Sequence, residues 1–233
     1  METSILVALS LQGVLQRSMA VIANNMANVN TSGFKAEQML AVDQEVASQR
    51  STVDGLGSTA YVRDVASLRD PSDGRLDVTD NPLDVALRGE GYFVVTTPDG
   101  DRYSRDGHFR LDANGQIVTE DGFALQAQGG SPLVLSPTDA TLSIARDGTV
   151  SSESGNLGKI RVVQFSDPTA LQPAGSGLAA SDTPPQDVLV PEMVQGMIER
   201  SNVEPINEME RMIRVQRAYD QAKQMADRED DRI

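Results

Sequence analysis

The sequence predicts an α+β protein, in which N- and C-terminal helices pair as a coiled-coil-like inner domain and a central antiparallel β domain lies between them along the chain. Apolar residues recur three to four positions apart at both ends, whereas in the middle the apolar period changes to two. Asp-Gly and Asn-Gly pairs separate the short runs of the middle. We therefore expect an N-terminal helix in residues 1–34, a bridging segment in 35–70, the β domain in 71–190 and a C-terminal helix in 191–233.

The first helix is expected from Glu2 to Val29, with Thr3 or Ser4 as its cap. Its charge is almost absent, and a helix so poor in charge is seldom a solvated surface helix, so most of its circumference is expected to meet protein. Asn-Thr-Ser-Gly then ends it, because Gly33 is free to take a positive φ. Its apolar positions at helical spacing are Val7, Leu11, Leu15, Ile22, Met26 and Val29.

The start of this helix does not have the pattern of a targeting segment. Residues 5–9 are apolar, but they follow Glu2 with no basic region before them. The polar side chains of Gln12, Arg17 and Asn24 interrupt the run before it could span a bilayer. We expect neither a cleaved secretion signal nor direct membrane insertion, so that if the protein leaves the cytoplasm another machine carries it.

The last helix is expected from Pro205 to Arg228, a stretch without Gly or further Pro. Pro205 suits a first helical turn, and Asn202 or Ser201 could cap it. A second, shorter helical piece is expected from Met193 to Glu199. One side of the last helix carries Met209, Met212, Ile213, Gln216, Tyr219, Ala222 and Ala226.

Neither terminal helix is expected to be stable alone, because an isolated amphipathic helix of this length is marginal in water. Burying a Leu, Ile or Met side chain contributes about 1.5–3 kcal/mol, so each helix needs an apolar partner surface. The ordinary alternative is that both helices pack on a globular core, but the middle of the chain looks like a self-sufficient β domain. We therefore expect two stripes to pair, one through Leu11, Leu15 and Ile22 and the other through Met209, Ile213 and Gln216.

In the middle, turn residues separate a series of expected strands of an antiparallel sandwich or half-closed barrel. The segments before and after it are expected to be linkers: residues 35–70 partly extended, and residues 166–191, rich in Ala, Ser, Gly and Pro, irregular. The expected strands are Tyr92–Thr97, Arg102–Arg105, His108–Asp112, Gln116–Thr119, Phe123–Leu125, Leu133–Leu135, Thr141–Ile144, Thr149–Ser151 and Ile160–Phe165.

Composition excludes several classes of function. The chain has 20 Lys and Arg against 34 Asp and Glu, a net charge of −14, which argues against binding nucleic acid or anionic lipid. It has no Cys, so a disulfide, a zinc–thiolate site and a cysteine nucleophile are all impossible.

No catalytic, cofactor-binding or metal-binding constellation emerges, and we expect no enzyme activity and no cofactor. The carboxylates of the middle region gather at turns, where Asp has a structural role. The single His108 shows no sign of a catalytic triad. Two short segments, 70–74 and 112–115, resemble calcium loops faintly but lack the closing Glu of an EF-hand. Gly89-Glu90-Gly91 is not followed by a helix that could hold a phosphate.

Four motifs carry a resemblance to a known family. They are residues 23–35 (ANNMANVNTSGFK), 81–93 (NPLDVALRGEGYF), 103–109 (YSRDGHF, with Asn114-Gly115 after it), and Ser201-Asn202-Val203 with Gln216 to Tyr219 (QRAY). In this order they resemble the flagellar rod and hook proteins of bacteria over most of the chain.

The resemblance narrows the position within that family. The length is too short for the hook protein and the β region is too large for the shortest rod subunits. The short bridging segment and Pro205 soon after Ser-Asn-Val favour the proximal rod subunit over the distal one. The last helix stops one or two turns earlier than the family pattern leads us to expect, which leaves open a shortened chain or a subtype that ends early. A cell-wall or carbohydrate-binding β module remains an alternative, although aromatic residues are only 4% and Trp is absent.

The resemblance implies passage through the flagellar type III export apparatus and helical assembly in the periplasm with copies of the chain and other rod proteins. The terminal helices would line a hollow drive shaft that transmits motor torque. The candidate assembly residues are Leu11, Leu15, Ile22, Asn25, Met26, Asn28, Gly33, Phe34, Met209, Ile213, Gln216, Arg217 and Tyr219.

Overall fold

The computed structural model describes residues 2–46, 59–136, 139, 141–167 and 171–230, and the chain divides into two compact units. Unit 1 consists of Met1–Val29, Glu37–Asp70 and Val203–Ile233, and unit 2 of Asn30–Ala36 and Pro71–Asn202. The expected α+β class is confirmed: both described helices belong to unit 1, and the strands pair antiparallel.

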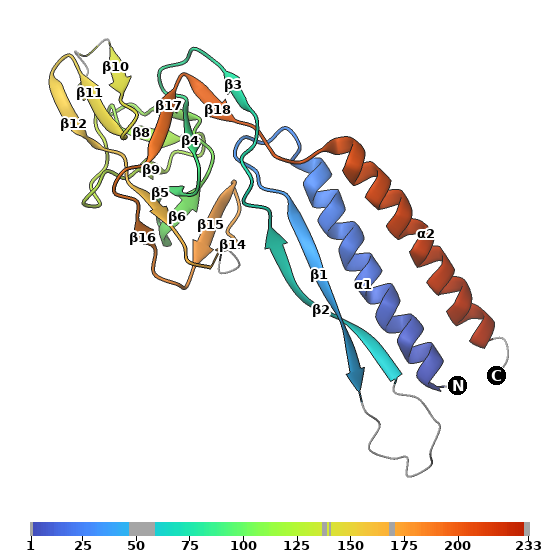
Figure 1. Ribbon diagram of the computed structural model, residues 1–233. Coiled ribbons are helices and arrows are strands. Elements are labelled where there is room, and N and C mark those ends of the chain that lie inside the picture. The colour runs from blue at the N-terminus through green and yellow to red at the C-terminus, as the bar shows by residue number, and fades with distance from the viewer. Residues whose placement is uncertain (1, 47–58, 137–138, 140, 168–170, 231–233) are drawn as a thin grey trace. The chain divides into compact units, whose positions relative to one another are not determined.

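Unit 1 places the two ends of the chain together. Helices α1 (Glu2–Ala27) and α2 (Pro205–Asp230) lie side by side and run in opposite directions (Figure 1). Strands β1 (Glu37–Val46) and β2 (Thr59–Arg69) form an antiparallel ladder with one irregularity between Leu40 and Ala41, and this ladder also contacts α1. The segment that the sequence predicted to be partly extended thus supplies two long strands.

The helix bounds follow the signals in the sequence. α2 starts at Pro205, whose missing N–H suits the first turn, and Glu208 N donates to Glu204 O. After α1 the chain turns through Asn28 to Gly33, and Gly33 has φ = 67°. The expected helices therefore form within two residues of the predicted starts and ends.

Unit 2 is built from several antiparallel sheets. In the largest, the order β14-β15-β6-β5-β9-β8-β7 is joined by β13, which pairs with both β5 and β16. A second sheet has the order β10-β11-β12, and β17 pairs with β4 and β18 with β3. The strands are β3 (Leu76–Val78), β4 (Val85–Arg88), β5 (Tyr92–Thr97), β6 (Gly100–Ser104), β7 (Phe109–Leu111), β8 (Ile117–Thr119), β9 (Ala124–Leu125), β10 (Leu142–Ile144), β11 (Thr149–Ser152), β12 (Gly155–Lys159), β13 (Val162–Gln164), β14 (Leu171–Pro173), β15 (Leu178–Ser181), β16 (Gln186–Asp187), β17 (Glu192–Gln195) and β18 (Met197–Glu199).

The core of unit 2 lies on both faces of β5. Phe93 packs edge-to-face on Phe109 with ring centroids 5.3 Å apart, and both belong to the larger apolar cluster. Val94 points the other way and joins a second cluster in which the ring of Tyr103 lies 4.8 Å from that of Phe165. Because successive side chains of a strand alternate between faces, β5 is buried on both sides.

Two sequence predictions are wrong. Met193 to Glu199 is not helical but forms β17 and β18, with a break at Gly196 where φ is 76°. The expected linker at 166–191 contains β14, β15 and β16: β14 pairs with β15, β15 also pairs with β6, and β16 pairs with β13. In addition, residues 133–135 form no named strand, only an isolated bridge between Gln116 and Val134.

Candidate assembly surface and its buried support

Fewer side chains of α2 are buried than its apolar pattern in the sequence predicts. Glu208 and Ala222 are buried, while Met212, Val215 and Tyr219 are partly buried. On α1, Val14 and Ile22 are buried, and Leu11 and Leu15 are partly buried. Unit 1 therefore has its own small interior within one copy of the chain.

Asn25 is the polar centre of this interior and is only 1% exposed. Its Nδ2 donates to Glu37 O at 2.8 Å, and its Oδ1 accepts from Glu37 N at 2.9 Å, so one side chain satisfies both backbone groups at the start of β1. The same Nδ2 lies 3.4 Å from Glu208 Oε2 on α2. Glu208 also accepts from Arg211 at 3.0 Å. The side chain thus links α1, β1 and α2.

A groove of about 370 Å³ runs beside this contact, between residues of α1, β1 and α2. Its lining combines apolar side chains, Val21, Ile22 and Met39 among them, with the guanidinium groups of Arg211 and Arg214.

The outward side of α2 is apolar over its first two turns. Ile206, Met209 and Ile213 are 73, 52 and 49% exposed, at spacings of three and four. The expectation that Met209 and Ile213 belong to the buried side of α2 is therefore wrong. Single exposed apolar residues are common, but three at helical spacing form one stripe.

The structure divides the 13 candidate assembly residues between the two units. Gly33 and Phe34 belong to unit 2, and the other eleven lie on α1, on α2 or, for Asn28, just after α1. Met26, Asn28, Phe34 and Tyr219 are partly buried, whereas Gln216 and Arg217 are exposed. Their role in assembly stays a prediction.

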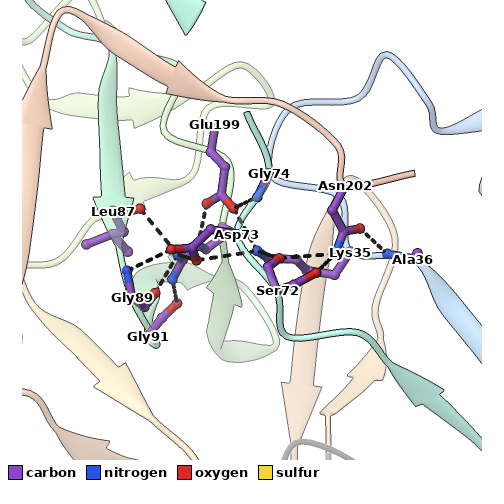
Figure 2. A network of polar contacts seen from close by, with 11 residues as sticks. Lys35, Ala36, Ser72, Asp73, Gly74, Leu87, Gly89, Gly91, Glu199 and Asn202 are labelled. Carbon is purple, nitrogen blue, oxygen red and sulfur yellow. Dashed lines mark hydrogen bonds and ion pairs between the residues drawn. The ribbon is translucent and has the colours of Figure 1, made fainter. Parts of the chain in front are cut away.

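Unit 2 contains a buried ionic network that the sequence reasoning missed (Figure 2). Glu199 is 2% exposed, and its Oε1 accepts from Lys35 Nζ at 2.7 Å and from Gly74 N at 2.8 Å. Its Oε2 accepts from Arg105 Nε at 2.6 Å. One carboxylate therefore neutralises two buried cations.

The other N–H groups of Arg105 and Lys35 also donate hydrogen bonds. Arg105 donates from Nη1 to Gly91 O and from Nη2 to Gly89 O, both at 2.6 Å, and Nη2 also reaches Leu87 O and Asp73 Oδ1 at 3.2 Å. Lys35 Nζ donates to the backbone oxygen of Ser72 at 2.6 Å. Among the described residues, every buried side-chain nitrogen and oxygen atom has a hydrogen-bond partner.

The network joins three segments of unit 2, each of which continues along the chain into unit 1. These are residues 30–36, 71–74 and 199–202. Asn202 strengthens the junction, since its Oδ1 accepts from Ala36 N at 2.7 Å and its Nδ2 donates to Ser72 O at 3.1 Å. Gly33 N donates to Glu199 O at 2.8 Å, and a Cβ at Gly33 would lie 2.4 Å from the Arg105 backbone.

Electrostatics fix the protonation of the network. Burial alone would raise the pKa of Glu199, but the charge of Arg105 and the hydrogen bonds from Lys35, Arg105 and Gly74 outweigh it and lower that pKa below its ordinary value. Glu199 is thus a carboxylate at neutral pH, and its acceptor sites are filled. Such a closed network supports a fold and leaves no group free for chemistry.

The other polar clusters also have structural roles. Asp112 caps its turn by accepting from Asn114 N and Gln116 N, and Asp147 accepts from Thr149 N, as the sequence predicted for turn carboxylates. The imidazole of His108 lies between Asp84, at 2.7 Å, and Glu120, at 3.5 Å.

Over the described ranges, no group of three or more His, Asp or Glu has a metal-binding arrangement. Neither α1 nor α2, as far as they are described, has an apolar stretch long enough to cross a membrane.

Lys35 and Arg105 did carry a signal in the sequence, because both lie inside the family motifs at 23–35 and 103–109. Glu199 lies just before Ser-Asn-Val. What the sequence could not supply was their pairing, since Glu199 is 164 positions from Lys35 and 94 from Arg105.

Paired terminal helices, an exposed apolar stripe and a closed polar network are features of a structural subunit. Comparison with known proteins agrees. A model described as flagella basal body rod protein matches residues 5–35, one described as flagellar hook protein FlgE/F/G D1 domain matches 86–152, and one described as flagellar basal body rod FlgEFG protein C-terminal matches 194–233.

Similar proteins cover nearly the whole chain. The flagellar basal-body rod protein FlgF of Caulobacter vibrioides is 34% identical over 229 residues, which cover 97% of this chain and 93% of that protein. FlgF of Mesorhizobium japonicum is 33% identical and covers 94 and 90%. The rod protein FlgG of Buchnera aphidicola subsp. Schizaphis graminum is 34% identical and covers 88 and 87%. The chain belongs to the flagellar basal-body rod protein family, whose members are structural and non-enzymatic, and the resemblance seen in the motifs is confirmed.

Proposed function

We propose that this chain is a subunit of the proximal rod of the bacterial flagellum, which assembles helically with its own copies and with other rod proteins into a hollow shaft that transmits motor torque. In this proposal the chain is exported through the flagellar type III apparatus without a cleaved signal and assembles in the periplasmic space. The pair of α1 and α2 acts as a coiled-coil-like lining of the shaft.

Two observations favour the proximal over the distal position. The FlgF relatives of Caulobacter and Mesorhizobium cover 97 and 94% of this chain, whereas the FlgG relative covers 88% at a similar identity. The short bridging segment, residues 35–70, and Pro205 soon after Ser-Asn-Val are the features of the sequence that support the same choice.

The observation that carries the assembly role is the outward stripe of α2. Its opposite side already packs within unit 1, and Ile206, Met209 and Ile213 stay exposed there, available to another molecule. Covering such side chains removes apolar surface from water at about 25 cal/mol per Å², which gives assembly a driving force that does not disturb the fold of one copy.

The test is Ile213→Asp. The variant should keep the helical circular dichroism of the wild type, because Ile213 is half exposed in one copy. In the rod it would bury an unpaired charge, at a cost of about 3–5 kcal/mol, so we expect cells to lose motility and basal bodies to lack the chain.

The matched control is Met225→Asp on the same helix, where Met225 is 65% exposed but lies off the stripe. This control should support motility. Functional rods built from the Ile213→Asp variant would exclude the stripe as an assembly contact.

A further inference from the structure

The single histidine of the chain lies where three segments of unit 2 meet. In the order of the largest sheet β7 comes last, next to β8. Because Phe109 pairs with Thr119, the residues that follow this pair in the ladder, His108 and Glu120, lie opposite each other. An isolated antiparallel bridge joins His108 to Asp84. The imidazole therefore has an acidic residue of a different segment on each side.

The two ring nitrogens of His108 face different carboxylates. Nδ1 lies 2.7 Å from Asp84 Oδ1, and Nε2 lies 3.5 Å from Glu120 Oε1. The side chain of Asp84 is only 3% exposed, whereas that of Glu120 is 70% exposed. Asp84 Oδ1 also accepts from Asn81 Nδ2 at 3.0 Å, which holds this carboxylate in place. One contact of the ring is thus shielded from water and the other is open to it.

A neutral imidazole can satisfy only one of these two acids. The neutral ring has one N–H and one lone pair, whereas the protonated ring has an N–H on both nitrogens. At 2.7 Å from Asp84, Nδ1 must carry the proton, because a lone pair there would face a carboxylate oxygen. Nε2 of the neutral ring then turns its lone pair toward Glu120. Only the protonated ring has a donor for each carboxylate.

We infer that His108 is a pH-dependent clasp, which holds Asp84 in both protonation states of its ring and holds Glu120 only when the ring is protonated. Histidine side chains change charge between about pH 5 and 8, so the clasp tightens as the pH falls through this range. The inference concerns unit 2 alone and does not rest on the proposed function.

The charges around the ring are mostly negative. Asp106 Oδ1 accepts from His108 N at 3.1 Å, so Asp106 joins Asp84 and Glu120 as a third carboxylate. The cation of this corner is Arg110, which donates to Glu120 O at 3.2 Å. Burial raises the pKa of Asp106, while the hydrogen bond and the charge of His108 act against this rise. The charges of Glu120 and Asp84 add to it. A proton on the ring supplies this corner with a second positive charge.

The clasp closes the open end of the β7–β8 hairpin. His108 and Glu120 follow the last ladder pair, Phe109 and Thr119. Opposite charges directly across a ladder stabilise it, whereas a lone pair that faces a carboxylate does not. Protonation of the ring therefore adds a cross-strand pair at the end of a strand that has only three residues. The contact to Asp84 joins the same position to the start of β4.

The first experiment measures urea unfolding of the full-length chain at about pH 5.5 and about pH 8, with wild type and His108→Gln. Gln keeps a donor for Asp84 but cannot take a charge. The unfolding equilibrium constant of unit 2 in the variant should exceed that of wild type about fivefold at the lower pH and less than about twofold at the higher pH. The near-ultraviolet signal of Tyr103 and its neighbours follows the transition. An equal ratio at both pH values overturns the inference.

Glu120→Gln separates the two contacts of the ring. An amide at position 120 can donate to the lone pair of the neutral ring and presents no charge to the protonated one. In this background the effect of His108→Gln at about pH 5.5 should fall from about fivefold to about twofold. Glu90→Gln is the control background, because Glu90 is exposed and is not among the carboxylates around His108, and it should leave the fivefold effect unchanged. An undiminished effect in the Glu120→Gln chain would exclude the contact to Glu120.

The third experiment observes the ring itself and needs no variant. Because the chain has one His, the ring nitrogens of a nitrogen-15-labelled chain are assigned without ambiguity by nuclear magnetic resonance. At about pH 8 the spectrum should show the proton on Nδ1 and the lone pair on Nε2, and at lower pH a proton on both. A neutral ring that carries its proton on Nε2 overturns the inference, even if the variants fail to fold.

Discussion

Glu199 shows how one residue holds unit 2 together. Its carboxylate binds Lys35 and Arg105, and the three side chains come from segments far apart in sequence. Buried ion pairs add little compared with well-packed apolar side chains, but removing one partner is costly because charges are left uncompensated. The network therefore makes the fold specific and sensitive to single substitutions.

Replacing Glu199 with Gln tests this at neutral pH. Two buried cations would lose their counter-charge, so the free energy of unfolding of unit 2 should fall by about 3–5 kcal/mol. Urea unfolding followed by the near-ultraviolet signal of Tyr103 and its neighbours measures it. Glu90→Gln, at an exposed position, is the control and should change the free energy by less than about 0.5 kcal/mol.

The same variant has a defined pH dependence. Because the folded protein lowers the pKa of Glu199, its contribution is fully present above the unfolded value of about 4.3 and is lost as the pH falls through the lower folded value. The difference between wild type and Glu199→Gln should therefore shrink below about pH 4.3. Asp106 acts in the opposite sense, since burial raises its pKa, but it is present in both proteins and cancels from the difference. A difference that stays constant to pH 2 would contradict the assigned role.

At the scale of the element, the long helices are predictable and the short strands of unit 2 only in part. α1 and α2 carry period-3.6 patterns over 26 residues each, and the strands next to Asp-Gly and Asn-Gly turns have a local signal as well. The segment Met193 to Glu199 has no decisive local signal, because a short apolar run fits a helix or a strand equally well. Its strand form is set by partners more than 100 positions away in β4 and β3.

The same reason explains the missed strands in residues 166–191. Their small and turn-forming residues predict a linker, and their strand form comes from pairing of β14 with β15, of β15 with β6 and of β16 with β13. For the candidate site, the sequence supplied the motif residues Lys35, Arg105 and Asn25 but not their partners. It also could not tell which side of α2 faces α1, because apolar residues lie on both sides of that helix.

Asn25→Ala tests how the elements of unit 1 depend on one another. The substitution leaves the partly buried backbone N–H and C=O of Glu37 without their side-chain partner, and each unsatisfied group costs up to about 1–3 kcal/mol. We expect the loss of stability to appear in helical circular dichroism on urea titration, because the described helices belong to unit 1. Asn24→Ala, an exposed neighbour, should cost much less. Equal effects of the two variants would show that the buried contacts are unimportant.

At the scale of the molecule, each unit is discontinuous in sequence, with three segments in unit 1 and two in unit 2. A chain that ends at Asn202 keeps all of unit 2 but lacks α2. We expect it to lose most of its helical signal, because α1 alone is marginal in water, while unit 2 keeps its urea midpoint. Full helical content in this truncated chain would mean that α1 folds without α2.

Because α1 and α2 lie at opposite ends of the sequence, unit 1 cannot form its helix pair until nearly the whole chain is present. Ala27, the last residue of α1, and Pro205, the first of α2, are separated by the whole of unit 2. In a chain that leaves the ribosome or a channel N-terminus first, α1 is exposed long before α2. Unit 2 can therefore fold before α1 and α2 pair. In the proposed rod, a chain broken off before α2 would lack Ile206, Met209 and Ile213, the side chains that we propose contact other copies, so incomplete chains would be left out of the assembly.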